Sequence, residues 1–352
     1  MSASLQTTLM NAWTRRGALA CLLWPLSLLF GALAALRRMA YRRGWRRAAR
    51  LPVPVVVVGN VVAGGAGKTP AALALAQHLQ SRGWRPGIVS RGYGRRGTGC
   101  LEVTPEADAA QTGDEPLLLR RRAGVPVFVA RRRFDAAAAL LAAHPDCDIL
   151  ICDDGLQHLA LARDVEVVVF DARGAGNGWL LPAGPLREPW PRDAGSAAQL
   201  ILRTEPGGAL PLPFDAALHE ARRSLAPDAL RANGQRVPLA SLQGQPLVAV
   251  AGIARPEAFF AMLRAAGLTL AGAEALPDHY DFDEGFFAAL RVSELTRAET
   301  GALLCTEKDA PKLWRGRPDA LAVPLDLRVP PAFFAALDAA LAARGYHPRA
   351  PQ

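Results

Sequence analysis

The stretch from Val55 to Thr69, VVVVGNVVAGGAGKT, constrains the fold more than any other part of the sequence. It begins with a short run of β-branched residues, Val55 to Val58, which is typical of a buried strand in a parallel sheet. A glycine-rich turn, Lys68 and Thr69 follow, and Pro70 then opens a helical stretch, where proline is well tolerated. Strand, glycine loop, Lys-Thr and helix in this order predict a phosphate-binding loop at a helix N-terminus.

The residues of this loop have distinct expected tasks. Backbone N–H groups can curl around an anion, Lys68 would reach the outer phosphates, and the hydroxyl of Thr69 would hold Mg²⁺. Val62 stands where the strict pattern has glycine, so an ordinary glycine-rich turn is the alternative. Because strand, Lys-Thr and helix all fall in place, nucleotide binding is the better interpretation. The candidate nucleotide-binding residues of the loop are Gly64, Gly65, Ala66, Gly67, Lys68 and Thr69.

Length and composition allow two domains with cores of their own, since the chain has 352 residues and is 51% hydrophobic. Its net charge of +9 suits a nucleic acid, an anionic membrane or a phosphorylated substrate. No recognised nucleic-acid motif occurs, so we expect no nucleic-acid partner. Five scattered cysteines without a CxxC pair favour a reducing compartment and argue against a structural zinc site.

An apolar run without a charged residue, Gly17 to Leu36, lies near the N-terminus and is just long enough to cross a bilayer. Arginines flank both ends, and the heavier cluster follows the run, so we expect the nucleotide-binding part to be cytoplasmic. We favour a helix or helical hairpin lying in the cytoplasmic leaflet, with its arginines on anionic lipid head groups. A single membrane span is the second interpretation and a buried core helix the third. The flanking arginines are Arg15, Arg16, Arg37, Arg38, Arg42, Arg43, Arg46 and Arg47.

Two pairs of adjacent acidic residues occur in the nucleotide-binding part. Asp114 and Glu115 precede a helical run, where carboxylates are common capping groups. Asp153 and Asp154 follow the apolar strand CDILIC, which ends at Cys152. Such a strand end opposite a lysine loop is what a Mg²⁺–nucleotide site needs. The pattern therefore predicts that Asp153 and Asp154 hold the metal together with Thr69.

Strands and helices alternate through this half, which predicts an α/β fold of the P-loop NTPase kind, a parallel sheet flanked by helices. The proline- and tryptophan-containing stretch from Asn177 to Pro191 interrupts the alternation and reads as an ordered loop that serves a site, with Arg187 projecting from it. A second, smaller α/β unit starts near Leu247 and closes a cleft. We expect an N-terminal membrane-associated helical segment over residues 1–50, a P-loop nucleotide-binding domain over 51–244 and a C-terminal α/β domain over 245–352.

Seven motifs in register resemble the tetraacyldisaccharide 4′-kinase family of lipid A biosynthesis. The likeness runs from about Val53 to the C-terminal helix and includes the hydrophobic N-terminus. It also accounts for Val62, since the phosphate loop of this family looks like GGxGKT. The motifs are GNVVAGGAGKTP, SRGYG, GDEP, DDGLQH, GNGWLLPAGPLRE, PDHYDF and TEKDA.

The resemblance implies an enzyme that uses ATP and Mg²⁺ to phosphorylate the 4′-hydroxyl of tetraacyldisaccharide 1-phosphate, forming lipid IVA. It places the protein at the cytoplasmic face of the bacterial inner membrane, peripheral or monotopic. The partners would be the acylated disaccharide lipid and anionic lipids of the inner membrane, and we expect a monomer.

By the same resemblance, Asp114 is the proton acceptor, assisted by His279, and Lys68 completes the catalytic set. Two departures leave these residues untouched: Tyr280 stands where many relatives have a second histidine, and GIARP at Gly252 to Pro256 differs from the commoner GIGNP-like form. A third departure is at Leu202 to Glu205, which lacks an expected asparagine. This third departure leaves the adenine contacts open. Further nucleotide-site residues implied in this way are Glu115, Asp154, Gln157, Arg187 and Arg133, the last being one of three adjoining arginines.

The alternative function is a membrane-associated P-loop ATPase or GTPase that acts on a protein partner. It would need a residue that positions a hydrolytic water, and Gln157 could serve. Dependence of ATP turnover on the disaccharide lipid separates the two hypotheses.

Overall fold

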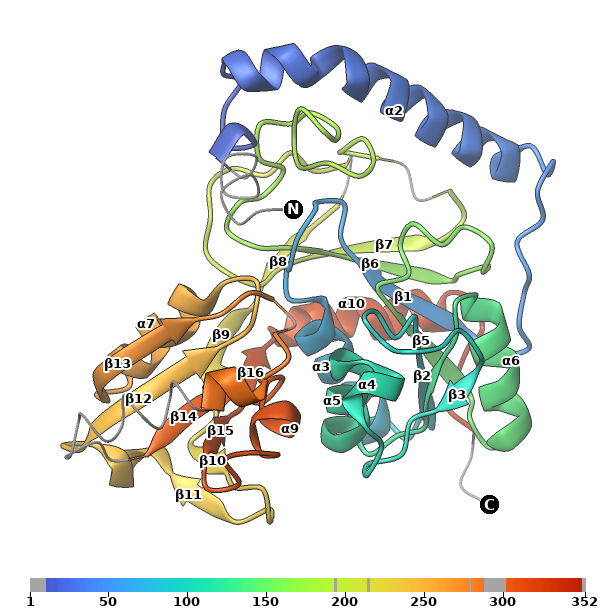
Figure 1. Cartoon of the computed structure of the whole chain (residues 1–352). Coiled ribbons are helices and arrows are strands. Elements are labelled where there is room, and N and C mark those ends of the chain that lie inside the picture. The colour runs from blue at the N-terminus through green and yellow to red at the C-terminus, as the bar shows by residue number, and fades with distance from the viewer. Residues whose placement is uncertain (1–10, 193–194, 214–215, 279, 288–301, 350–352) are drawn as a thin grey trace.

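The chain forms two large β-sheets and an extended N-terminal helix (Figure 1). The computed structural model describes residues 11–192, 195–213, 216–278, 280–287 and 302–349. His279 lies outside the described residues, so the expected partnership of His279 with Asp114 stays a prediction.

The first sheet has eight strands in the order β3-β4-β2-β5-β1-β6-β7-β8. All neighbouring pairs are parallel except β3 with β4. This confirms the predicted parallel α/β sheet and puts the valine strand β1 near its middle, buried on both faces. The strands are β1 (Val55–Gly59), β2 (Pro86–Ser90), β3 (Leu101–Glu102), β4 (Val127–Val129), β5 (Ile149–Asp153), β6 (Val165–Phe170), β7 (Ala198–Arg203) and β8 (Leu218–Glu220).

Helices cover both faces of this sheet, because alternate strand residues point to opposite sides. Val56 and Val58 share one core with α3 (Lys68–Ser81), α5 (Asp114–Ala123) and α10 (Pro331–Ala342). Val55 and Val57 share the other core with α6 (Arg133–Ala143). The short helix α4 (Ala109–Thr112) leads directly into α5.

The second sheet has six strands in the order β11-β10-β15-β14-β12-β13. Helix α7 (Pro256–Ala265) and the 3₁₀ turn η1 (Leu239–Leu242) pack on one face, and α9 (Ala310–Leu313) on the other. Strands β12, β13, β14 and β15 run parallel to their neighbours among these four. Strand β10 pairs antiparallel with β15, and β11 pairs antiparallel with β10. The strands are β10 (Asp228–Leu230), β11 (Arg236–Pro238), β12 (Pro246–Ala251), β13 (Thr269–Ala275), β14 (Leu303–Thr306) and β15 (Leu321–Val323).

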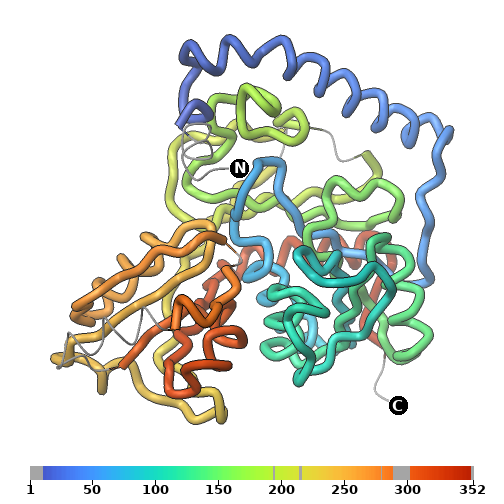
Figure 2. The backbone as a smooth tube through the Cα atoms, in the orientation of Figure 1, coloured from blue at the N-terminus to red at the C-terminus, as the bar shows by residue number. Residues whose placement is uncertain are grey.

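The chain passes between the two sheets twice, and the two crossing segments pair as the antiparallel ribbon of β9 (Arg222–Leu225) and β16 (Leu325–Arg328). We call the part built on the eight-stranded sheet the first unit and the part built on the six-stranded sheet the second unit. In Figure 2 the red C-terminal segment returns to the first unit, where α10 packs on β6 and β7. The second sheet therefore differs from the expected 245–352 domain in two respects. The second sheet begins with β10, which precedes residue 244. Helix α10 falls within residues 245–352 but packs on the first sheet, where its apolar face completes the core.

Helix α2 (Ala18–Arg42) is one continuous helix with Pro25 inside it, and it is long and apolar enough to cross a membrane. It lies along the first unit rather than within it (Figure 1). One stripe of the helix packs on the body, where Ala20 and Ser27 are buried. Seven of its large apolar side chains have more than two fifths of their surface exposed: Leu22, Trp24, Leu26, Leu28, Leu29, Leu33 and Leu36.

The loop from Asn177 to Pro191 joins this helix to the phosphate loop. On one side, Ser27 Oγ donates to the carbonyl of Leu180 at 2.8 Å and accepts from the N–H of Ala183 at 3.0 Å. On the other, the N–H of Arg187 donates to the carbonyl of Val61 at 2.7 Å. Val62 is buried and pairs with Leu186, which explains why this position is not a glycine: it is extended and packed rather than curled around a ligand.

Candidate active site

The glycine loop adopts the geometry that the sequence predicts. Gly67 has φ 85° and forms the N-cap of α3, so Lys68 and Thr69 occupy the first turn of that helix. Gly64 also has a positive φ, 97°, a conformation that favours glycine at both positions. Thr204 Oγ1 donates to the carbonyl of Ala66 at 3.0 Å and Asn60 Nδ2 donates to the carbonyl of Gly64 at 3.1 Å. The loop is therefore held from both sides.

The acidic strand end lies directly beside this loop, because β5 pairs with β1 and Asp153 is in register with Val58. Lys68 Nζ lies 3.6 Å from Asp154 Oδ1. Asp154 has φ 49°, an unusual conformation for a residue with a side chain, and its carbonyl accepts from Arg133 Nη2 at 3.0 Å. Arg187 Nη1 lies 3.8 Å from the same carboxylate oxygen. Four of the residues singled out in the sequence thus converge on one point.

The surroundings of the Asp153 carboxylate suit a bound cation better than a hydrogen-bond donor of the protein. It is fully buried, and neither of its carboxylate oxygens has a hydrogen-bond partner among the described residues. The pKa of Asp153 is raised to about 7, first by burial and then by the negative charges of Glu115 and Asp154. The positive charges of Lys68 and Arg133 act in the opposite direction and lower this pKa. A bound divalent cation would stabilise the ionised form of such a carboxylate.

The described residues contain no group of three or more His, Cys, Asp or Glu side chains that could hold a metal ion by themselves. Mg²⁺ does not require such a group, because it commonly binds one or two carboxylates and completes its coordination shell with phosphates and water. Thr69, Asp153 and Asp154 are therefore suited to Mg²⁺ bound together with a nucleotide.

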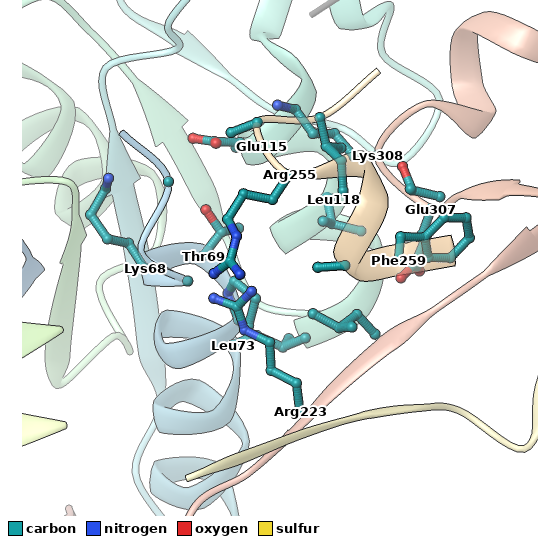
Figure 3. A pocket seen from close by; sticks show the side chains of 18 of the residues that line it. Lys68, Thr69, Leu73, Glu115, Leu118, Arg223, Arg255, Phe259, Glu307 and Lys308 are labelled. Atoms are coloured by element: carbon teal, nitrogen blue, oxygen red, sulfur yellow. The ribbon is translucent and has the colours of Figure 1, made fainter. Parts of the chain in front are cut away.

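A cavity of about 220 Å³ opens from the phosphate loop into the space between the two units. In Figure 3, Lys68 and Glu115 lie on one side of it and Phe259 and Glu307 on the other. Its wall beyond the loop is largely apolar, with contributions from both units, as a flat heterocycle would require. The apolar lining residues are Leu73, Leu118, Leu119, Ile253, Ala254, Ala258, Phe259, Met262, Val323 and Leu325.

Two arginines that the sequence did not single out also line this cavity. Arg223 and Arg255 both bind the carboxylate of Glu205, Arg223 at 2.7 Å. Figure 3 shows their guanidinium groups beside Thr69. Glu205 belongs to the LRTE segment that departs from the family pattern, and the structure gives it a partner in each of two segments. Nothing local in the sequence connects these three residues.

Asp114 and Gln157 are placed differently from the residues above. Asp114 starts α5 and is buried, but it lines an adjoining cavity, where Lys312 Nζ lies 2.8 Å from its Oδ2.

Gln157 Nε2 donates to the carbonyl of Asn60 at 2.9 Å and to Glu188 Oε1 at 2.8 Å. It therefore braces the loop that follows β1, and Glu188, which the sequence analysis missed, links it to Arg38 of α2 at 3.1 Å.

Comparison with known proteins shows the family of the chain. The family model for tetraacyldisaccharide-1-P 4′-kinase matches residues 19–342. The chain belongs to the tetraacyldisaccharide 4′-kinase family. Relatives with that name include one from Acidovorax sp. (strain JS42), 60% identical over 96% of this chain and 95% of the relative. Another, from Delftia acidovorans, is 55% identical over 94% of both chains.

The family also has a solved structure with the same fold. The crystal structure of LpxK from Aquifex aeolicus in complex with ATP matches with a TM-score of 0.76 and 27% sequence identity. The match covers 93% of this chain and 100% of that one. The fold and family expected from the seven motifs are thereby confirmed, and membership of this family makes the chain a kinase.

Proposed function

We propose that the chain transfers the γ-phosphoryl group of ATP to the 4′-hydroxyl of tetraacyldisaccharide 1-phosphate, forming lipid IVA. The observation that carries this proposal is the meeting of Lys68 with Asp154 where β1 and β5 end side by side, in a chain whose relatives bear that activity in their name. Phosphoryl transfer asks a protein mainly for positioning and charge stabilisation, and both are available at this point.

The phosphates of ATP would lie on the loop from Gly64 to Gly67, with Lys68 on the outer phosphates. Thr69, Asp153 and Asp154 would hold Mg²⁺, which when bound neutralises charge on the β- and γ-phosphates. Arg133 and Arg187 position Asp154 through its carbonyl and carboxylate. Gln157 keeps the loop after β1 in place, and Glu115 faces the same cavity as Lys68. The apolar wall around Leu118 and Phe259 suits the adenine ring.

Asp114 would accept the proton of the 4′-hydroxyl while the hydroxyl oxygen bonds to the γ-phosphorus and ADP leaves with the electrons of the broken P–O bond. His279 would assist by orienting Asp114 or sharing its proton. Because Asp114 lines a cavity next to the one that holds Lys68, the acceptor sugar would enter between the two units and meet both residues there.

Membrane association follows from the acylated substrate and from α2. The leucines on the outer side of α2 would lie among the acyl chains, because the opposite stripe of the helix already packs on the Asn177–Pro191 loop. We place the enzyme at the cytoplasmic face of the inner membrane, as a monomer, with its N-terminal arginines on anionic head groups.

The test is whether ATP consumption requires the lipid acceptor. Purified protein with ATP and Mg²⁺ should consume ATP only when tetraacyldisaccharide 1-phosphate is added, and ADP and phosphorylated lipid should form in equal amounts. Rapid ATP or GTP hydrolysis without the lipid would instead support the alternative, an ATPase or GTPase that acts on a protein partner.

A further inference from the structure

Lysine is scarce in this chain and its placement is selective. Of the 41 lysine and arginine residues only three are lysines, namely Lys68, Lys308 and Lys312. All three lie at the cleft between the two units. Lys68 and Lys308 line the cavity at the phosphate loop, and Lys312 pairs with Asp114. A lysine ammonium is a compact point charge with rotatable donors, whereas arginine carries a planar fork. The chain thus carries arginine elsewhere and has lysine at the cleft, where a compact cation faces the site.

Lys308 belongs to the TEKDA motif, to which the proposed function gives no role. Its backbone is held firmly, because Asp309 Oδ2 accepts from the N–H of Gly252 at 3.0 Å and from Thr306 Oγ1 at 2.5 Å. The motif follows β14 at the carboxyl end of the second sheet. The phosphate loop follows β1 at the carboxyl end of the first. Lys308 therefore stands on a fixed turn that faces the phosphate loop.

The surroundings of Lys308 keep it charged and turned toward the cleft. Its side chain is only 14% exposed, and its Nζ lies 2.8 Å from Asp278 Oδ1. Burial lowers the pKa of Lys308, but the negative charges of Glu115, Asp278 and Asp114 outweigh burial and the pKa is raised overall. Glu115 lies on the first unit and lines the same cavity. Asp278 of the second unit thus holds the ammonium group before any ligand arrives, and Glu115 of the first unit adds negative charge from the other side of the cavity.

We propose that Lys308 reaches across the cleft to bind the γ-phosphate of ATP, opposite Lys68. This inference rests on the proposed function. A cation on each side of the transferring group would stabilise the charge that moves onto the leaving and transferring oxygens. Asp278 holds Lys308 when no triphosphate is present and shares it once ATP is bound. Since ADP has no γ-phosphate, Lys308 makes the site prefer ATP to ADP.

Calorimetric binding of ADP and of a non-hydrolysable ATP analogue, each with Mg²⁺, tests this directly on the full chain. Lys308→Met should weaken binding of the ATP analogue by about 10- to 100-fold, the usual effect of losing a hydrogen bond between charged groups. Binding of ADP should change by less than about threefold. Arg315→Met is the control, since it removes a positive charge of the same unit from a half-exposed side chain that pairs with Asp108, and it should leave the ratio of the two affinities unchanged.

Equal weakening of ADP and ATP-analogue binding by Lys308→Met, or no weakening of either, would overturn the inference and leave Lys308 as a structural partner of Asp278. The proposed function fails separately, through absence of lipid phosphorylation by the wild-type protein. If Lys308→Met does not fold, reductive methylation of wild-type protein provides the second measurement. The ATP analogue should protect Lys308 better than ADP does, with Lys312 as internal reference, and equal protection by both nucleotides would count against a γ-phosphate contact.

Discussion

Lys312 and Asp114 form an ion pair across the boundary between the two units, with Nζ 2.8 Å from Oδ2. Both side chains are largely buried, and Lys312 Nζ also donates to the carbonyl of Tyr280 at 3.3 Å. The carboxylate expected to accept the proton of the sugar hydroxyl is thus positioned by a residue of the other unit.

The first prediction concerns this pair. Lys312→Met should lower kcat by roughly tenfold and change the KM for ATP little, because a mispositioned base weakens only the chemical step. Lys312→Arg should recover part of the loss. The double variant with Asp114→Asn should be scarcely slower than Asp114→Asn alone, since the two residues act as one unit. Independent, multiplicative losses in steady-state kinetics would speak against the coupling.

Lys68→Ala is expected to reduce turnover by about three orders of magnitude, since it removes a charge aimed at the transferring phosphoryl group. Arg82→Ala, just beyond the other end of α3, removes an exposed charge and should leave the rate unchanged. Single-turnover rates with the lipid acceptor measure the effect. A Lys68→Ala enzyme that retained normal turnover would refute the assignment of the phosphate loop.

Membrane binding should depend on the exposed leucines of α2. Replacing Leu22, Leu29 and Leu33 together by aspartate should abolish co-sedimentation with anionic vesicles, because each change puts a charge where an acyl chain would lie. Leu101→Asp, at an exposed leucine of β3 in the first sheet, should not affect it. Binding of the wild type should persist at high salt, because apolar insertion is not screened. Release by salt alone would indicate attachment through the arginines only.

Ser27 should contribute to stability out of proportion to its size. Ser27→Ala removes both the donor to the carbonyl of Leu180 and the acceptor for the N–H of Ala183. We expect a loss of about 1–3 kcal/mol in the free energy of unfolding. The control is Ser241→Ala, at an exposed serine whose hydroxyl bonds the carbonyl of Pro238, and it should cost less than about 0.5 kcal/mol. Urea denaturation in detergent compares them, and equal losses would mean that Ser27 does not anchor α2.

Local sequence predicts the centre of this fold well and its connections poorly. Strand β1, helix α3 and the acidic end of β5 follow from uninterrupted patterns of a few residues each, and the pairing of β1 with β5 brings Lys68 to Asp154. By contrast, β10 and β11 have three residues each, too few to show a period. Helix α10 is apolar, but its sequence does not tell which sheet it covers, and the tertiary fold returns it to the first.

The same limit applies to the candidate site. Residues that share a motif were found together, as with Asp153 and Asp154. The ion pair of Lys312 with Asp114 joins positions 198 apart in the chain, and the contact between Glu205 and Arg255 joins positions 50 apart. Such contacts depend on how the two sheets face each other across the β9–β16 ribbon that connects them. No short pattern in the sequence encodes it.

The position of the transferred phosphate tests the central claim most directly. Wild-type protein should be incubated with γ-labelled ATP, Mg²⁺ and tetraacyldisaccharide 1-phosphate in detergent, and the labelled product located by mass spectrometry and phosphorus NMR. We predict one labelled phosphate per acceptor, on the 4′-oxygen, with no labelled product from Lys68→Ala. Label on another oxygen, or label released as inorganic phosphate at a rate that the lipid does not change, would contradict it.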